Sequence, residues 1–409
     1  MAELHRLPNG LSVLVDRMAG AQSASVGLYA AVGSRSEPED RGGLAHMLEH
    51  MVFKGAGSRD ARGIAEAIEN VGGQLNAWTA RDQTVFHART LPADVPLAVE
   101  LIADLIRDPR LDEAELEREK GVILSELGEC RDNPEDRLGD LLFEAAYPEQ
   151  PLGRPIIGHE GSIAVTTQAD LQRWIGDQLI PARLLLVATG AVDADAILQL
   201  AERRFGDMAA RVAPASPAAA FGGGKRIDAR AFEQAHWSFA LEGLPGSDPM
   251  MPALSVFAQA VGGGMSSRLF QQLREERGLC YSVYAWTQGF ADTGIFAINA
   301  ATDRPTARQS LELAREIVAD AAATLSDEEA ARARAQIIAQ MLMSLESVQG
   351  RADHHARMFE LFGRVVPVEE TLPEIAAVDA RAARTAGQRL LAGPVALASI
   401  GGGRLALAA

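Results

Sequence analysis

The chain has few cysteines and no membrane-spanning stretch. Its 409 residues include only Cys130 and Cys280, which argues against a disulfide scaffold, and neither lies in a pair with metal-ligand spacing. No apolar run reaches the roughly 20 residues of a membrane helix. The first residues have neither the apolar core of a signal peptide nor the Arg- and Ser-rich character of a transit peptide. We therefore expect a cytoplasmic protein of bacterial type, in a reducing compartment and without a membrane partner.

Aromatic residues and clustered basic residues are also scarce. Aromatics make up 5% of the chain, although 47% hydrophobic content is ample for globular packing. The formal net charge is −16 and no basic stripe is visible, which argues against nucleic acid as a partner. This charge favours cationic peptide substrates through long-range attraction, although ordinary solubility explains it equally well. The length predicts two domains.

The most informative pattern is His-x-x-Glu-His, formed by His46, Glu49 and His50. If the segment is helical, the two imidazoles are four residues apart on one face and can share a metal ion. Glu49 is then placed to act beside the metal without ligating it. The alternative is a helix with polar residues on a solvated face. Apolar neighbours throughout residues 44–53 favour a buried helix, in which His and Glu need partners.

A second acidic helix is predicted at residues 111–127. Glu119 and Glu126 are seven residues apart, so they lie two turns apart on one face. Most carboxylates of this helix are expected to be solvated, but Glu126 follows the apolar run 122–124. Two His and one Glu with a fourth position open to water would form a catalytic zinc site.

Hydrophobic periodicity predicts an α+β protein with an internal repeat. Strands are expected at 11–15, 24–32, within 74–88 and at 184–189, and helices at 60–71, 93–107 and 194–205. The second half repeats this order with helices at 252–261, 267–277, 306–323 and 327–346 and a strand at 279–286, but without the metal-ligating residues. The Pro-, Ala- and Gly-rich stretch between the halves reads as a linker. The predicted division is a zinc-binding domain at 1–212, a linker at 213–226 and a metal-free repeat at 227–409.

These motifs, in this order, resemble those of the M16 metallopeptidases, the pitrilysin and insulin-degrading group. The chain is most similar to the two-domain M16B branch, which includes the mitochondrial processing peptidase and its bacterial relatives. The resemblance covers nearly the whole chain and is carried by residues 7–11, 33–37, 46–55, 71–77 and 117–126. It implies two homologous α+β domains of the processing-peptidase type, each a mostly antiparallel sheet with helices on one side.

The resemblance also implies roles for the residues at the predicted metal site. His46, His50 and Glu126 would hold one zinc ion per chain. Glu49 would be the general base, and Glu119 a second carboxylate that supports the site.

Two further pairs of residues are implied to bind substrate. Arg274 and Tyr281 match the family's Arg-x6-Tyr pair, in which the Tyr donates to the scissile carbonyl and the Arg holds the substrate backbone. Asn76 and Ala77 lie on the edge strand that receives the substrate as an added strand in the family. The alternatives are structural roles for Arg274 and Tyr281, and a turn-flanking position for Asn76.

The predicted function is therefore that of a zinc metalloendopeptidase acting on peptides or unfolded polypeptide segments. Family members of this length imply a homodimer, or a heterodimer with a related chain. The alternative is a non-catalytic structural or peptide-binding subunit with the same fold.

Overall fold

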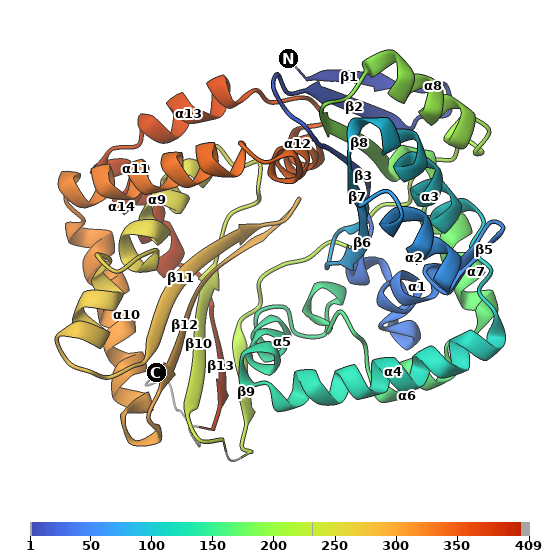
Figure 1. Ribbon diagram of the computed structural model, residues 1–409. Coiled ribbons are helices and arrows are strands. Elements are labelled where there is room, and N and C mark those ends of the chain that lie inside the picture. Colours follow the sequence, from blue (N-terminus) through green and yellow to red (C-terminus); the bar gives the residue numbers. More distant parts are fainter. Residues whose placement is uncertain (1, 231, 402–409) are drawn as a thin grey trace. The chain divides into compact units, whose positions relative to one another are not determined.

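The computed structural model describes residues 2–230 and 232–401, which form two compact units (Figure 1). The first unit comprises the chain up to Leu127 together with Pro155–Pro217 and Met343–Pro367. The second comprises Gly128–Arg154, Ala218–Leu342 and the chain from Val368 onward. Each unit thus includes one segment that is distant in sequence from the rest of it. The linker at 213–226, between the two repeated halves of the sequence, stays a prediction.

The first unit is built on a six-stranded sheet in the order β1-β2-β8-β3-β7-β6. Its strands are β1 (Glu3–Arg6), β2 (Ser12–Arg17), β3 (Ala24–Ala30), β6 (Gln74–Thr79), β7 (Thr84–Thr90) and β8 (Leu184–Gly190). All neighbours are antiparallel except β2 and β8, which confirms the expected mostly antiparallel sheet. A separate two-stranded ribbon pairs β4 (Gly55–Ala56) with β5 (Arg59–Asp60). Strand β6 lies at the edge of the large sheet and pairs with β7 alone.

Helices cover both faces of this sheet. Those of the first unit are α1 (Leu44–Val52), α2 (Ala61–Glu69), α3 (Val95–Arg107), α4 (Glu113–Asp132), α6 (Glu160–Val165), α7 (Gln168–Gln178), α8 (Ala194–Phe205) and α12 (Val348–Phe362), with the end of α4 passing into the second unit. Helix α3 packs on β3 and β7, whereas α12 packs on β3 and β8 through a cluster that includes Tyr29 and Ala352. Because successive strand residues point to opposite faces, α12 covers the face opposite α3 (Figure 1). This refines the expectation of helices on one side.

The second unit repeats the plan with a five-stranded sheet in the order β11-β12-β10-β13-β9. Its strands are β9 (Gly224–Asp228), β10 (Ala235–Glu242), β11 (Ser282–Gly289), β12 (Gly294–Thr302) and β13 (Val395–Ile400), and its helices are α5 (Pro134–Ala146), α9 (Met251–Gly262), α10 (Ala307–Thr324), α11 (Asp327–Ser344), α13 (Val368–Ala376) and α14 (Ala380–Leu391). Only β9 and β13 run parallel. Helix α5 packs on β9, β10 and β13 through its own apolar cluster, so each sheet receives a helix from the other half of the sequence.

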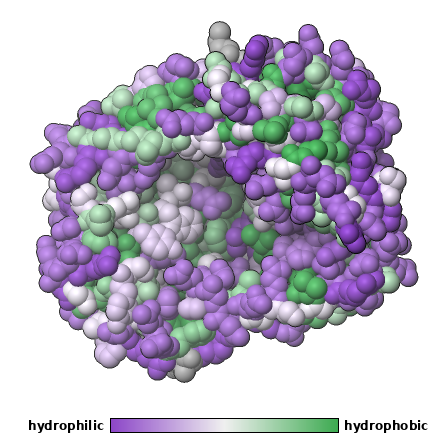
Figure 2. All heavy atoms as spheres, in the orientation of Figure 1, coloured by the Kyte–Doolittle hydropathy of each residue, from purple (hydrophilic) through white to green (hydrophobic). Residues whose placement is uncertain are grey.

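Most predicted elements are found close to their expected bounds. The helix expected at 194–205 is α8, and the strand expected at 184–189 is β8. The segment 267–277 differs, because residues Phe270–Glu275 form a π-helix, a form often found at functional sites. Hydrophilic side chains dominate the face in Figure 2, as the high charge suggests. Within the described residues, no helix combines the length and apolarity that crossing a membrane requires.

Candidate metal centre

Helix α1 begins at a position that the local sequence fixes tightly. Gly43 adopts φ +88, and a Cβ there would lie 2.5 Å from the carbonyl oxygen of Ile157, so glycine is required. The buried Glu37 carboxylate accepts hydrogen bonds from the backbone N–H groups of Gly43 and Ala45, both at 2.8 Å. A carboxylate at a helix N-terminus satisfies free donors and complements the helix dipole. Glu37 and Gly43 therefore set the start of the helix that carries His46.

Three side chains converge as the sequence predicts. Nε2 of His46 and Nε2 of His50 lie 3.8 and 3.6 Å from the same Oε2 atom of Glu126. Tetrahedral zinc with bonds near 2.0–2.1 Å separates its ligand atoms by about 3.3 Å, so small movements bring these atoms to zinc geometry. The Glu126 Oε2 atom is buried and has no hydrogen-bond partner. Among the described residues, this is the one group of three His, Cys, Asp or Glu side chains placed to hold a metal ion.

Both imidazoles are presented for metal binding, but in different ways. Burial, followed by the neighbouring His50, lowers the pKa of His46 to about 4, so His46 is neutral at pH 7, as a metal ligand must be. His50 is oriented by Glu119, whose Oε2 lies 3.1 Å from His50 Nδ1. This bond leaves Nε2 of His50 free to face Glu126.

Lys54 completes this arrangement, and the sequence analysis did not identify it. Its Nζ lies 2.8 Å from Oε1 of Glu119, a residue that is only 4% exposed. The ammonium group thus compensates a buried carboxylate that in turn orients His50. Lys54 follows His50 by four residues. This helical spacing is the sequence signal that could have placed Lys54 near the site. Glu119 thus contacts the far side of the His50 ring, whereas Glu126 faces the Nε2 atoms of both imidazoles.

Glu49 lies close to His50 and Glu126. Burial raises the pKa of its carboxyl and the nearby Glu126 adds to this rise, whereas Thr79 and His50 oppose it. Its Oε2 atom is buried and without a hydrogen-bond partner. Such an oxygen is available to a water molecule held next to the metal ligands.

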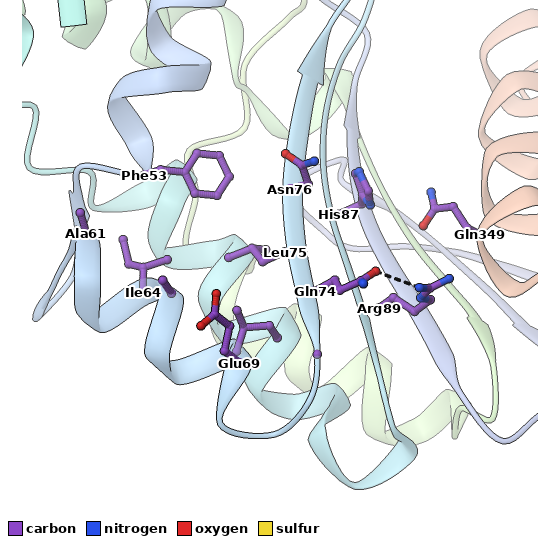
Figure 3. A pocket seen from close by; sticks show the side chains of 13 residues that line it. Phe53, Ala61, Ile64, Glu69, Gln74, Leu75, Asn76, His87, Arg89 and Gln349 are labelled. Carbon is purple, nitrogen blue, oxygen red and sulfur yellow. Dashed lines mark hydrogen bonds between the residues drawn. The ribbon is translucent and has the colours of Figure 1, made fainter. Parts of the chain in front are cut away.

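Asn76 and Ala77 lie on the edge strand β6, as predicted. The Ala77 backbone N–H donates to Asn76 Oδ1 at 2.8 Å, so this N–H is not used by the ladder to β7. A pocket of about 700 Å³ opens along this strand (Figure 3). Its lining residues come from α2, β6 and β7, from residues next to α1 and β6, and from α12: Phe53, Ala61, Ile64, Ala65, Ile68, Glu69, Gly73, Gln74, Leu75, Asn76, His87, Arg89 and Gln349.

Arg274 and Tyr281 belong to the second compact unit, so their part in the site stays a prediction. Arg274 lies in the π-helix, and its guanidinium stacks 4.7 Å from the Phe270 ring centroid. Tyr281 is 53% exposed, and its hydroxyl donates to Asp303 Oδ1 at 2.9 Å. The hydrogen bond to Asp303 raises the pKa of Tyr281, so the phenol keeps its proton at neutral pH.

Comparison with known proteins identifies the family. Residues 12–160 match the family described as Insulinase (Peptidase family M16), and residues 166–337 match the Peptidase M16 inactive domain. The chain belongs to the M16 peptidase family.

Its relatives include proteins from several bacteria. It is 35% identical to an uncharacterized zinc protease of Mycobacterium tuberculosis, over 94% of this chain and 90% of the relative. It is 30% identical to the uncharacterized zinc protease YmxG of Bacillus subtilis, over 98% of each chain. The fold matches the crystal structure of a peptidase M16 inactive domain from Pseudomonas fluorescens, with a TM-score of 0.90 and 20% identity over 98% of this chain and 97% of that one. A protease from Helicobacter pylori matches with a TM-score of 0.89 and 19% identity, over 98% and 99% of the two chains.

Proposed function

We propose that this protein is a zinc-dependent endopeptidase that cleaves peptides or unfolded polypeptide segments. The observation that carries the proposal is the convergence of His46, His50 and Glu126 beside Glu49, whose Oε2 atom is buried and has no hydrogen-bond partner. When bound, zinc supplies a Lewis acid that polarises a carbonyl and lowers the pKa of water. The names of the relatives support the choice of zinc.

The protein's own residues then carry the proton transfers and the binding. Glu49 accepts the proton of the attacking water and delivers it to the leaving amine, and burial, which raises its pKa, suits a group that must hold a proton briefly. Glu119 holds the His50 ring in position through the bond to Nδ1. The free edge of β6 offers backbone donors and acceptors to an extended substrate, a mode that tolerates varied sequences.

The second unit would supply Arg274 and Tyr281 to the substrate, with the Tyr281 hydroxyl donating to the developing oxyanion. The hydroxyl would have to leave Asp303 to do so. Tyr281→Phe is therefore expected to lower kcat while the bound zinc is retained. Loss of zinc from this variant would contradict the assigned role.

The proposed assembly is a homodimer, since this chain has both the metal ligands and the Arg274–Tyr281 pair. Mixing inactive Glu49→Gln and Tyr281→Phe chains tests whether the pair acts within one chain. We expect no recovery of activity. Recovery above either parent would mean that the pair acts on the zinc site of the partner chain.

The decisive test is digestion of a complex peptide mixture, with mass spectrometry of the products. We expect cleavage that a zinc chelator abolishes and that added zinc restores. Glu126→Gln should lose most of its zinc and its cleavage together. Undiminished cleavage after zinc removal would contradict the proposal. A structural subunit is the competing function, and the complete ligand set argues against it.

A further inference from the structure

Alternate residues of β6 point their backbone N–H and C=O groups to the free edge of the sheet, and this fixes which residues an added strand would pair with. The Ala77 N–H is bonded to the Asn76 side chain and not to β7, so it points away from the sheet. Backbone groups alternate along a strand, so those of Leu75 and Thr79 point the same way. An added strand would pair with these residues, and its own side chains would alternate between the two faces of the sheet.

The two faces beside this edge differ in chemistry. On one side lie the apolar Phe53, Ile64 and Leu75, and on the other lie His87 and Arg89 (Figure 3). The pocket-lining residues of α2 are mostly apolar. The one carboxylate among them is that of Glu69. This carboxylate would repel an acidic side chain on the apolar side.

The polar face carries a cation that has no carboxylate partner among the described residues. Arg89 is paired with Gln74 across β6 and β7, and its guanidinium donates to the neutral Gln74 Oε1 at 2.8 Å. The guanidinium thus extends toward the free edge. Burial lowers the pKa of His87, the other basic residue of the pocket, and the nearby Asp353 carboxylate opposes this shift. The lowered pKa favours the neutral imidazole. Arg89 is therefore the one cationic side chain among the described residues that line the pocket.

We propose that Arg89 is a specificity-determining residue that selects an acidic side chain on one face of the bound peptide, while the neighbouring peptide residues on the other face are apolar. The inference rests on the proposed peptidase function. The chain as a whole is acidic, with a formal net charge of −16, but the side chain in contact with Gln74 is the positively charged Arg89.

The position of the selected residue follows from the length of β6. Thr79, at the far end of the strand, lies next to Glu49 and influences its pKa. Gln74 is five residues away, or about 17 Å along a strand. The acidic residue should therefore lie about four to six residues from the scissile bond.

The test uses peptides that are identical except for Glu, Gln or Lys placed at each successive position. An exposed ion pair contributes about 0.2–1 kcal/mol, so wild-type kcat/KM should be about 1.4- to five-fold higher for Glu than for Gln at one position. Glu at either adjacent position should lower it. Raising the salt concentration should reduce the preference. Arg89→Lys should retain the preference for Glu, whereas Arg89→Glu should reverse it in favour of Lys.

Arg62→Glu is the matched control, because Arg62 lies on α2 with an 85% exposed side chain paired with Glu66 and does not line the pocket. It should keep the wild-type preference. Two results would overturn this inference and leave the peptidase proposal standing. One is that the wild type cleaves the peptides without preferring Glu at one position and disfavouring it at the adjacent positions. The other is that Arg89→Glu keeps the wild-type preference. Absence of cleavage of every peptide by the zinc-loaded wild type would instead overturn the peptidase proposal.

Discussion

Removal of the Lys54 ammonium group should weaken zinc binding, although Lys54 is not a ligand. In Lys54→Met, the buried Glu119 carboxylate loses the cation 2.8 Å from its Oε1. Glu119 then no longer holds the His50 ring firmly through the 3.1 Å bond to Nδ1. Loss of a direct hydrogen-bond partner of a ligand costs about 10- to 100-fold in metal affinity, or about 1.4–2.8 kcal/mol. Lys54 acts one contact further out, so its removal should cost no more than this range.

The assay is competition for zinc with a chromophoric chelator of known affinity at fixed pH. Lys54→Arg should stay within a few-fold of wild type, because a guanidinium can replace the charge. Lys120→Met is the matched control, since Lys120 forms its 2.7 Å ion pair with Glu117 on α4. Wild-type zinc affinity in a folded Lys54→Met protein would show that the Lys54–Glu119 contact does not support zinc binding.

Two further predictions concern the scaffold. Gly43→Ala should destabilise the protein by more than the roughly 1–2 kcal/mol of positive-φ strain alone, because its Cβ would clash with Ile157. Gly20→Ala is the control, since Gly20 has φ +82 and open space around it, and should show only the strain. Equal losses of stability in urea melts of the two variants would exclude the clash. Glu329, held by two bonds to Arg268, should contribute about 1–3 kcal/mol at neutral pH. The hydrogen bonds with Arg268 lower the pKa of Glu329 from 4.5 to about 2, so this stability is present above pH 4.5 and is lost as the pH falls toward 2. A difference between wild type and Glu329→Gln that stays constant over this range would contradict the assignment.

Local spacing predicted which side chains share a helix face, the family resemblance added the separate roles of Glu126 and Glu119, and neither predicted the contact of Lys54 with Glu119. The i, i+4 spacing of His46 and His50 places both imidazoles on one face of any helix, and two turns relate Glu119 and Glu126 in the same way. Spacing does not say which carboxylate takes the ligand position. The approach of α4 to α1 decides this, and Lys54 becomes relevant only through that tertiary contact.

The packing of α12 was beyond sequence reasoning for a similar reason. Its apolar face of Val348, Ala352 and Ala356 predicts that the helix is covered, but it does not say by which sheet. Its partners lie more than 150 residues away, and Thr189 Oγ1, which donates to the Val348 carbonyl at 2.6 Å, is one of them. By contrast, the helix α8 and the strand β8 were predicted nearly to the residue, because their hydrophobic periodicity and end signals are local.

In the proposed mechanism, Glu49 performs the chemistry beside a zinc ion that it does not bind. The most direct test is the turnover of the zinc-loaded Glu49→Gln protein on a peptide that the wild type cleaves, with zinc content measured on the same samples. We predict equal zinc in both proteins and a loss of about 10²- to 10⁴-fold in kcat for the variant, because an amide cannot accept the proton of water. Near wild-type turnover by the fully zinc-loaded variant would contradict this account.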